Sequence, residues 1–280
     1  NDHRDASGET IETGAGAAIN ANTGSVAFDR TVYPVPFGTD TPNGLGFKLH
    51  STVVITDTTD DLAAGNVVVH VRVNDADYDT SAAGEDTISD GVAWGNNAFD
   101  SSADHRVVIK VERGSNEAII STPGNSTTSM KEVSPNSGVF EYDQSITFTD
   151  GPSQGCPTAF TAQSLTGCVL QGDIVTVTYK DLTDASGKSQ TVTDSATFDL
   201  RNGVLQSDKS VYLIGSDMIL TLIEPDFDLD NDGAESLTLD LVEWDSDAVE
   251  TTLGGKQLPA SDDALAFDPE PSAFRETGDS

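Results

Sequence analysis

A run of acidic residues with the spacing of metal ligands stands in the last third of the chain. It follows an apolar segment over residues 218–223, places an aspartate at every second position and ends in Gly233. Carboxylates on one side of a tight turn supply the hard oxygen ligands of which Ca²⁺ collects about 6–8. We therefore predict a Ca²⁺ site here. Its candidate ligands are Asp226, Asp228, Asp230 and Asp232.

The run resembles the start of an EF-hand loop but does not complete one. Counted from Asp228 as the first ligand, the twelfth position is Leu239 instead of glutamate, and the twelfth residue of an EF-hand is a bidentate Glu. A helical EF-hand is therefore excluded. We expect a loop between two strands, completed by a distant carboxylate such as Glu235 or Asp240 or by an acid from a neighbouring domain.

A second acidic run, Asp75, Asp77 and Asp79, follows the alternating apolar segment 67–73. Asp75 and Asp226 are 151 residues apart. A second pattern is also shared, because Asp29-Arg30-Thr31-Val32-Tyr33 is similar to Asp208-Lys209-Ser210-Val211-Tyr212, and these two segments are 179 residues apart. The first copy therefore has 28 extra residues between its two patterns (179 minus 151). Two landmarks in the same order predict a duplicated domain with an acidic loop at a strand end in each copy.

The elements that must position these loops are short strands. Segments rich in Val, Ile, Thr and Tyr recur between polar turns, and no long segment has a helical period. This pattern is typical of tandem antiparallel β-sandwich domains of immunoglobulin-like architecture, an all-β fold. The expected units are an arm or end of a preceding unit over residues 1–23, an immunoglobulin-like domain with the acidic loop over 24–129, a second with the cysteine loop over 130–200, and a third over 201–280 that repeats the first.

The end of the chain is similar in sequence to an earlier segment. Residues 274–280 resemble residues 130–137, which lead into a strand at 138–140. We therefore expect the third domain to be cut short and the chain to be a segment of a longer protein.

Net charge excludes several partners. The 14 basic residues against 47 acidic ones give −33 and a pI near 4.1. Nucleic-acid binding starts with neutralisation of phosphates by Lys and Arg, so nucleic acid is excluded, and an anionic membrane surface is disfavoured for the same reason. No stretch approaches the ~18 apolar residues of a membrane span, so this segment is not expected to insert into a membrane.

The two cysteines and one sequon indicate an extracellular setting. Cys156 and Cys168 lie in a Gly/Pro/Ser/Thr-rich excursion, and a local disulfide in an oxidising compartment is favoured over two buried thiols. Asn125, in Asn125-Ser126-Thr127, is the glycosylation candidate.

Catalytic patterns are weak. Residues 151–155 match the G-x-S-x-G elbow, but the elbow needs a helix after its turn, and Pro152 and Pro157 oppose one. The four histidines lack the spacing of zinc ligands. We predict no catalytic residues and no enzyme activity.

Several strand and turn phrases resemble the repeats of surface-layer (S-layer) proteins of ammonia-oxidising archaea. They are Ser134-Pro135-Asn136-Ser137-Gly138-Val139-Phe140-Glu141, Gly172-Asp173-Ile174-Val175-Thr176-Val177-Thr178-Tyr179, Ser186-Gly187-Lys188-Ser189, Asp194-Ser195-Ala196-Thr197-Phe198-Asp199-Leu200 and Asp208-Lys209-Ser210-Val211-Tyr212. The resemblance covers residues 130–250 well and 24–130 more loosely. It implies strings of immunoglobulin-like domains, a crystalline coat around the cell, bound divalent cations and glycosylation.

These observations predict a structural cell-surface protein that self-assembles into a two-dimensional lattice, binds Ca²⁺ and concentrates small cations such as ammonium. Three alternatives stay open. A Ca²⁺-dependent extracellular adhesin or binding module would have a discrete ligand face and would not self-assemble. An extracellular hydrolase would lose turnover after one acid-to-amide change. Salt adaptation of a cytoplasmic domain would explain the charge but leaves the cysteine loop and the strand-end acidic loops unexplained.

Overall fold

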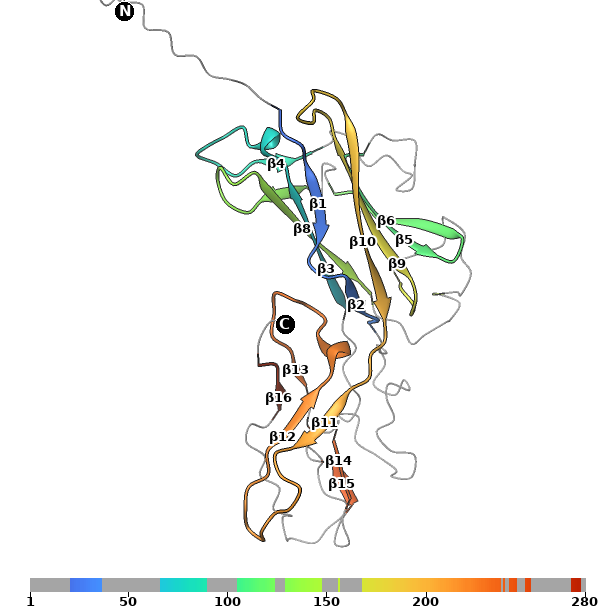
Figure 1. Cartoon of the computed structure of the whole chain (residues 1–280), viewed down its shortest axis with the longest axis vertical. Helices are drawn as coiled ribbons and strands as arrows, with labels where there is room; N and C mark the ends of the chain where they lie inside the picture. Colours follow the sequence, from blue (N-terminus) through green and yellow to red (C-terminus); the bar gives the residue numbers. More distant parts are fainter. Residues whose placement is uncertain are drawn as a thin grey trace, which may run out of the picture.

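The computed structural model describes residues 21–36, 66–89, 105–123, 129–147, 156, 168–237, 239, 242–245, 250–252 and 273–277. Within these ranges the chain is mostly β, with 3₁₀ turns and no α-helix (Figure 1). Its antiparallel sheets are consistent with β-sandwich domains. The immunoglobulin-like topology remains a prediction.

In the described part of the first unit there are two five-stranded sheets. One has the order β1-β3-β8-β7-β4, made by β1 (Ser25–Phe28), β3 (Val67–Asn74), β4 (Thr87–Ile88), β7 (Met130–Glu132) and β8 (Val139–Ile146). The other has the order β2-β10-β9-β5-β6, made by β2 (Val32–Pro34), β5 (Val107–Arg113), β6 (Asn116–Ser121), β9 (Ile174–Asp181) and β10 (Gln190–Asp199).

Alternation in the sequence explains which face each strand buries. In β3 every second side chain is buried, from Val67 to Val73, and the residues between them are more exposed. β9 follows the same rule, with Val175, Val177 and Tyr179 buried. Because successive side chains of a strand point to opposite faces, the inner faces of the two sheets enclose one apolar core.

The expected boundary between residues 129 and 130 is wrong. β3 pairs with β8, β5 pairs with β9, and β2 pairs in parallel with β10. Each pair joins a strand from before the boundary to one from after it, so the described strands of the two expected domains form one sandwich with one core. Alternation identified the strands and their buried faces, but it does not say which strands pair.

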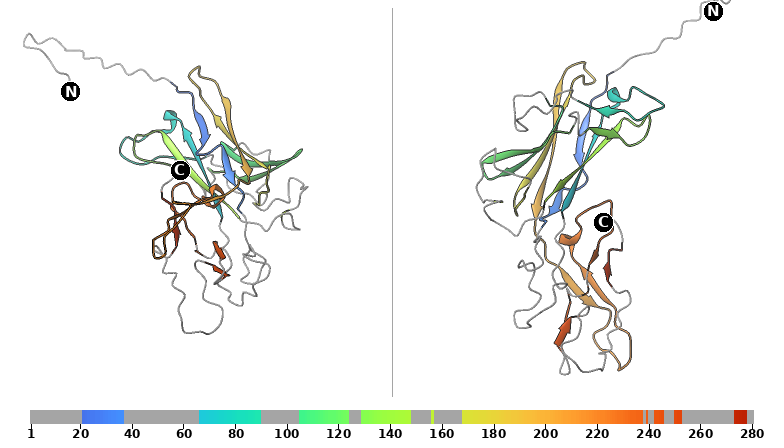
Figure 2. Two further views of the ribbon diagram at one scale, coloured as in Figure 1. Left: turned by 60° about the horizontal axis from the view of Figure 1, so that its bottom comes forward. Right: turned by 180° about the vertical axis from the view of Figure 1, so that it is seen from behind.

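The second unit contains β11 (Val204–Ser207), β12 (Leu220–Ile223), β13 (Ser236–Leu237), β14 (Glu243–Asp245), β15 (Glu250–Thr252) and β16 (Phe274–Arg275). They form three two-stranded antiparallel sheets in the described residues, β11-β12, β13-β16 and β14-β15. The two units lie end to end (Figure 2).

The second unit shares a strand register and a following turn with the first. β11 pairs with β12 in the register of β1 with β3: Val204 lies opposite Ile223 as Ser25 lies opposite Asn74. The 3₁₀ turns η1 (Ala76–Tyr78) and η2 (Pro225–Phe227) follow β3 and β12. These turns change the alignment of the two acidic loops that the sequence predicted, because equivalent residues of η1 and η2 are 149 positions apart in the chain rather than 151. The first copy thus has 30 extra residues (179 minus 149).

Cys156 and Cys168 form a disulfide, as predicted. Disulfides persist in oxidising environments, which agrees with an extracellular setting. None of the helices in the described part of the chain is long and apolar enough to cross a membrane.

Candidate metal centres

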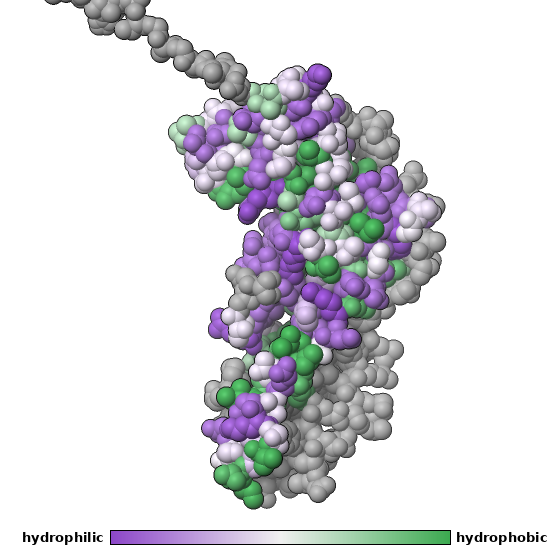
Figure 3. Space-filling view, viewed as in Figure 1, coloured by the Kyte–Doolittle hydropathy of each residue, from purple (hydrophilic) through white to green (hydrophobic). Residues whose placement is uncertain are grey.

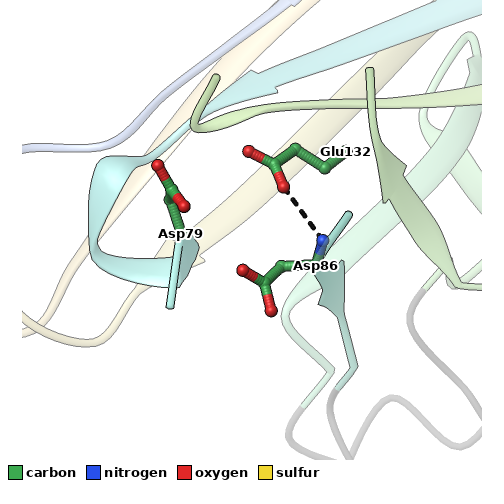
Figure 4. A group of neighbouring side chains, drawn as sticks. All are labelled: Asp79, Asp86 and Glu132. Carbon is green, nitrogen blue, oxygen red and sulfur yellow. Dashed lines mark hydrogen bonds between the residues drawn. The ribbon is translucent and has the colours of Figure 1, made fainter. Parts of the chain in front are cut away.

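Three carboxylates converge at one end of the first sandwich (Figure 4). Asp79, Asp86 and Glu132 each offer one oxygen, and these oxygens all lie within 4.8 Å of one another. Asp79 caps the C-terminus of η1, Asp86 directly precedes β4, and Glu132 ends β7. The cluster therefore joins the acidic loop to the β4-β7 edge.

Backbone hydrogen bonds shape the loop around these side chains. Asp86 Oδ2 accepts from the amides of Thr80 and Ser81, both at 2.8 Å. Glu132 Oε2 accepts from Asp86 N at 2.9 Å, and Glu132 N donates to Asp86 O at 2.9 Å. Glu132 Oε1 accepts from Gly138 N at 2.9 Å. The loop, β4 and β7 are thus held together through two of the three carboxylates.

The same bonds set the charge of the cluster. The hydrogen bond from Ser81 N, followed by those of Thr80, holds the pKa of Asp86 below its usual value. The amides of Asp86 and Gly138 likewise lower the pKa of Glu132. Desolvation, then repulsion by Glu132 and Asp86, raises the pKa of Asp79. Two carboxylates are therefore kept ionised beside a third that they repel, an arrangement that a bound cation would stabilise.

The second unit builds the same cluster from Asp228, Glu235 and Glu276, whose oxygens again lie within 4.8 Å of one another. Glu235 Oε1 accepts from the amides of Leu229 and Asp230 at 3.1 and 2.9 Å, as Asp86 does in the first unit. Glu235 N donates to Glu276 Oε2 at 3.2 Å, and Glu276 N donates to Glu235 O at 3.0 Å.

The two clusters differ in protonation. Burial, and then the adjacent Glu276 carboxyl, raises the pKa of Glu235 to about 7. Its equivalent Asp86 has a lowered pKa. Near neutral pH the second cluster therefore retains a proton for part of the time, whereas Asp86 and Glu132 stay ionised.

The second acidic loop lies at the joint between the two units. Arg30 Nη2 donates to Asp228 Oδ1 at 2.6 Å and Arg30 Nη1 donates to Asp228 O at 2.9 Å. His70 Nε2 lies 3.0 Å from Asp230 Oδ1. Val68 N donates to Leu229 O at 2.8 Å, and the Leu229 side chain packs against the core of the first sandwich. Asp228 is thus shared by a carboxylate cluster and an interdomain ion pair.

Of the seven predicted ligands, Asp79 and Asp228 lie in the clusters. Glu235 was named as a completing ligand and lies there too. The other aspartates make different contacts. Asp75 is 2% exposed and accepts hydrogen bonds from the Tyr179 hydroxyl and from Asp77 N. Asp77 accepts a hydrogen bond from Asn22 N, and Asp226 accepts one from Arg201 N. Asp230 and Asp232 lie near His70, the latter at 3.8 Å.

Sequence reasoning missed Asp86, Glu132 and Glu276 as members of carboxylate clusters that could hold a metal ion. The sequence contains a pattern that could have identified two of them. Residues 274–280 are similar to residues 130–137, and Glu276 is the equivalent of Glu132 in this similarity. The glycosylation candidate Asn125 and the G-x-S-x-G segment at 151–155 lie outside the described residues.

Fold and site together define an acidic β-sandwich protein with a repeated three-carboxylate cluster. No protein-family model matches the sequence, and no curated protein is significantly similar to it.

Proposed function

We propose that this chain is a Ca²⁺-binding structural segment of a cell-surface lattice of the S-layer type. The observation that carries the proposal is the repetition of one cluster in two units. The bonds from the loop amides to Asp86 recur at Glu235, and the bond from Asp86 N to Glu132 recurs between Glu235 N and Glu276.

The ligand chemistry favours Ca²⁺ over other divalent ions. Three carboxylates leave room for water and backbone oxygens to complete the 6–8 ligands that Ca²⁺ takes in flexible geometry. Mg²⁺ requires near-ideal octahedral geometry and gives up its waters reluctantly. Zn²⁺ prefers Cys and His ligands, and both clusters consist of carboxylates alone.

The position of the second cluster suggests a mechanical role. Asp228 belongs to the cluster and also accepts from Arg30 of the preceding unit. A cation that fixes Asp228 would hold the second loop in the conformation that meets the first sandwich. Ca²⁺ would therefore stiffen the joint, which a rigid two-dimensional lattice requires.

The charge of the chain supports the proposed cation enrichment. A net −33 produces surface potentials of several kT that raise the local concentration of small cations. In an extracellular coat, ammonium would be among them. The disulfide and the S-layer-like phrases support the location.

Thermal unfolding against Ca²⁺ at constant ionic strength tests the metal assignment. An ion that binds only the folded state stabilises it by RT ln(1 + [L]/Kd), about 2.7 kcal/mol at one hundred times Kd. We expect Glu132→Gln and Glu276→Gln each to lose part of this gain. Glu117→Gln is the control, because Glu117 is an exposed acid paired with Lys110 outside the clusters. Equal stabilisation by Na⁺ at the same ionic strength would refute the proposal.

Electron microscopy of the parent assembly, with and without a chelator, tests the lattice. Ordered arrays that loosen on chelation are expected. A monomer that binds a discrete ligand in Ca²⁺ and forms no arrays would instead identify the adhesin. Equilibrium dialysis of labelled ammonium across assembled coats checks the enrichment, which salt should weaken as the Debye length shortens from about 30 Å at 0.01 M to about 8 Å at 0.15 M.

A further inference from the structure

The second unit has large apolar side chains that are exposed to solvent. Val211 is 78% exposed, Leu213 82% and Ile214 108%, and Ile219 nearby is 63% exposed. Figure 3 shows apolar side chains gathered on the exposed face of this unit. Large apolar side chains that are exposed close together in the chain are typical of an interaction site in soluble proteins.

The first unit shows which element covers the equivalent residues. Val211, Tyr212 and Leu213 correspond to Val32, Tyr33 and Pro34 of β2, by the offset of 179. β2 pairs in parallel with β10, with Val32 opposite Thr197, Tyr33 opposite Phe198 and Pro34 opposite Asp199. Tyr33 is fully buried, with its ring centroid 5.8 Å from that of Phe198.

Two hydrogen bonds made around β2 in the first unit recur within residues 208–219. Tyr212 Oη donates to Asp208 Oδ1, as Tyr33 does to Asp29. Asp208 N donates to Ile219 O at 3.0 Å, as Asp29 N does to His70 O at 3.2 Å in the first unit. Bonds that restrain a segment before a strand binds it reduce the conformational entropy lost on binding.

We propose that residues 211–214 are the docking edge for a partner β-hairpin of the β9-β10 type. The second strand of the hairpin lies parallel to residues 211–213, as β10 lies along β2. Its apolar side chains alternate, and an aromatic residue at the position of Phe198 packs on Tyr212. Backbone pairing with an exposed edge gives affinity and the side-chain pockets give specificity, as in other cases of strand addition.

A peptide with the sequence of residues 172–200 is the probe. The full chain is titrated into the fluorescently labelled peptide, and binding is measured as an increase in fluorescence anisotropy. We expect saturable one-to-one binding, about tenfold weaker for the double variant Val211→Asp/Leu213→Asp and for a peptide carrying Phe198→Asp, a loss of about 1.4 kcal/mol. The double variant should fold normally, because both side chains are largely exposed.

A second measurement does not depend on folding of the isolated peptide. The same hairpin is joined to the C-terminus of the full chain through a flexible linker, and hydrogen exchange at residues 211–214 is compared with that of the unfused chain. Slower exchange in the fusion, absent in the double variant, supports the proposal. Unchanged exchange together with no peptide binding overturns it. Self-association of the unfused chain that the double variant abolishes also overturns it, because it assigns the edge to a second copy.

Discussion

Arg30 of the first unit and Asp228 of the second form a two-pronged contact across the interdomain joint. The guanidinium donates to the carboxylate at 2.6 Å and to the backbone carbonyl at 2.9 Å. Both side chains are largely buried, with 10% and 14% exposed. The joint is therefore a specific interface rather than a flexible linker, and Asp228 couples it to the second carboxylate cluster.

Removal of this contact should loosen the joint. Arg30→Met should cost roughly 1.5–3 kcal/mol of interdomain coupling, the range for a hydrogen bond to a charged group. Small-angle scattering should show a wider spread of overall dimensions, and a double-mutant cycle with Asp228→Asn should show coupling between the two sites. Arg72→Met is the control, because the Arg72–Glu141 pair is exposed and such pairs contribute about 0–1 kcal/mol. Equal effects of the two variants would contradict the assigned role of Arg30.

A buried ion pair beside the disulfide should be important for the first sandwich. Arg113 Nε donates to Asp173 Oδ1 at 2.8 Å, and the two residues are 8% and 1% exposed. Arg113→Met leaves a buried carboxylate without its cation, which typically costs roughly 3–5 kcal/mol. Chemical denaturation should detect this loss. Lys110→Met, at a more exposed pair with Glu117, should cost less than about 1 kcal/mol, and an equally small loss for Arg113→Met would refute the prediction.

Asp208 should titrate unusually low because of Tyr212. The hydrogen bond from the Tyr212 hydroxyl, followed by that from Ile219 N, lowers the pKa of Asp208 to about 2 from 3.8. A carboxyl whose folded pKa is depressed stabilises the fold above its unfolded pKa, and this contribution is lost as pH falls through the folded pKa. The window is therefore between about pH 4 and pH 2.

Carbon NMR of the Asp208 carboxyl measures this directly. In Tyr212→Phe its pKa should move towards the usual value, and the loss of stability of the second unit between about pH 4 and pH 2 should become smaller. Tyr142→Phe is the control, since Tyr142 contacts Ser121 and Gln144 instead. An unchanged pKa in Tyr212→Phe would show that the hydroxyl is not the cause.

Gly24 should not tolerate a side chain. A Cβ at this position would lie 2.7 Å from Tyr179 Cε1 and 3.0 Å from Asp75 Oδ2. Tyr179 is fully buried, so it has little room to shift, and overpacking of this kind costs roughly 1–3 kcal/mol. Gly24→Ala should lower the melting temperature clearly. Gly84→Ala is the matched control, because its nearest contact is an ordinary 3.4 Å to Ser81 Oγ, and a melting temperature equally low there would contradict the packing explanation.

The sequence alone determined features that depend on residue type and local spacing. Alternation located strands such as β3 and β9 and their buried faces, because side chains alternate across a strand. The shared phrases at Asp29 and Asp208 predicted a duplication, and the strands that flank them pair in equivalent registers. The aspartates at alternate positions placed an acidic loop after β3 and another after β12. The short separation of Cys156 and Cys168 indicated their disulfide.

Only the tertiary structure decided how distant segments meet. The partner of a strand is set by packing of the whole core, so alternation could not show that β3 pairs with β8 or that one sandwich spans the expected boundary at residues 129–130. The candidate ligand sets depend on the same pairing, because Asp86 and Glu132 meet only when β4 lies beside β7. Spacing within the loop favoured Asp75 and Asp77, whereas the fold turns Asp75 towards Tyr179 and Asp77 towards Asn22. Coordination is a three-dimensional property, and a linear run of acids gives only its candidates.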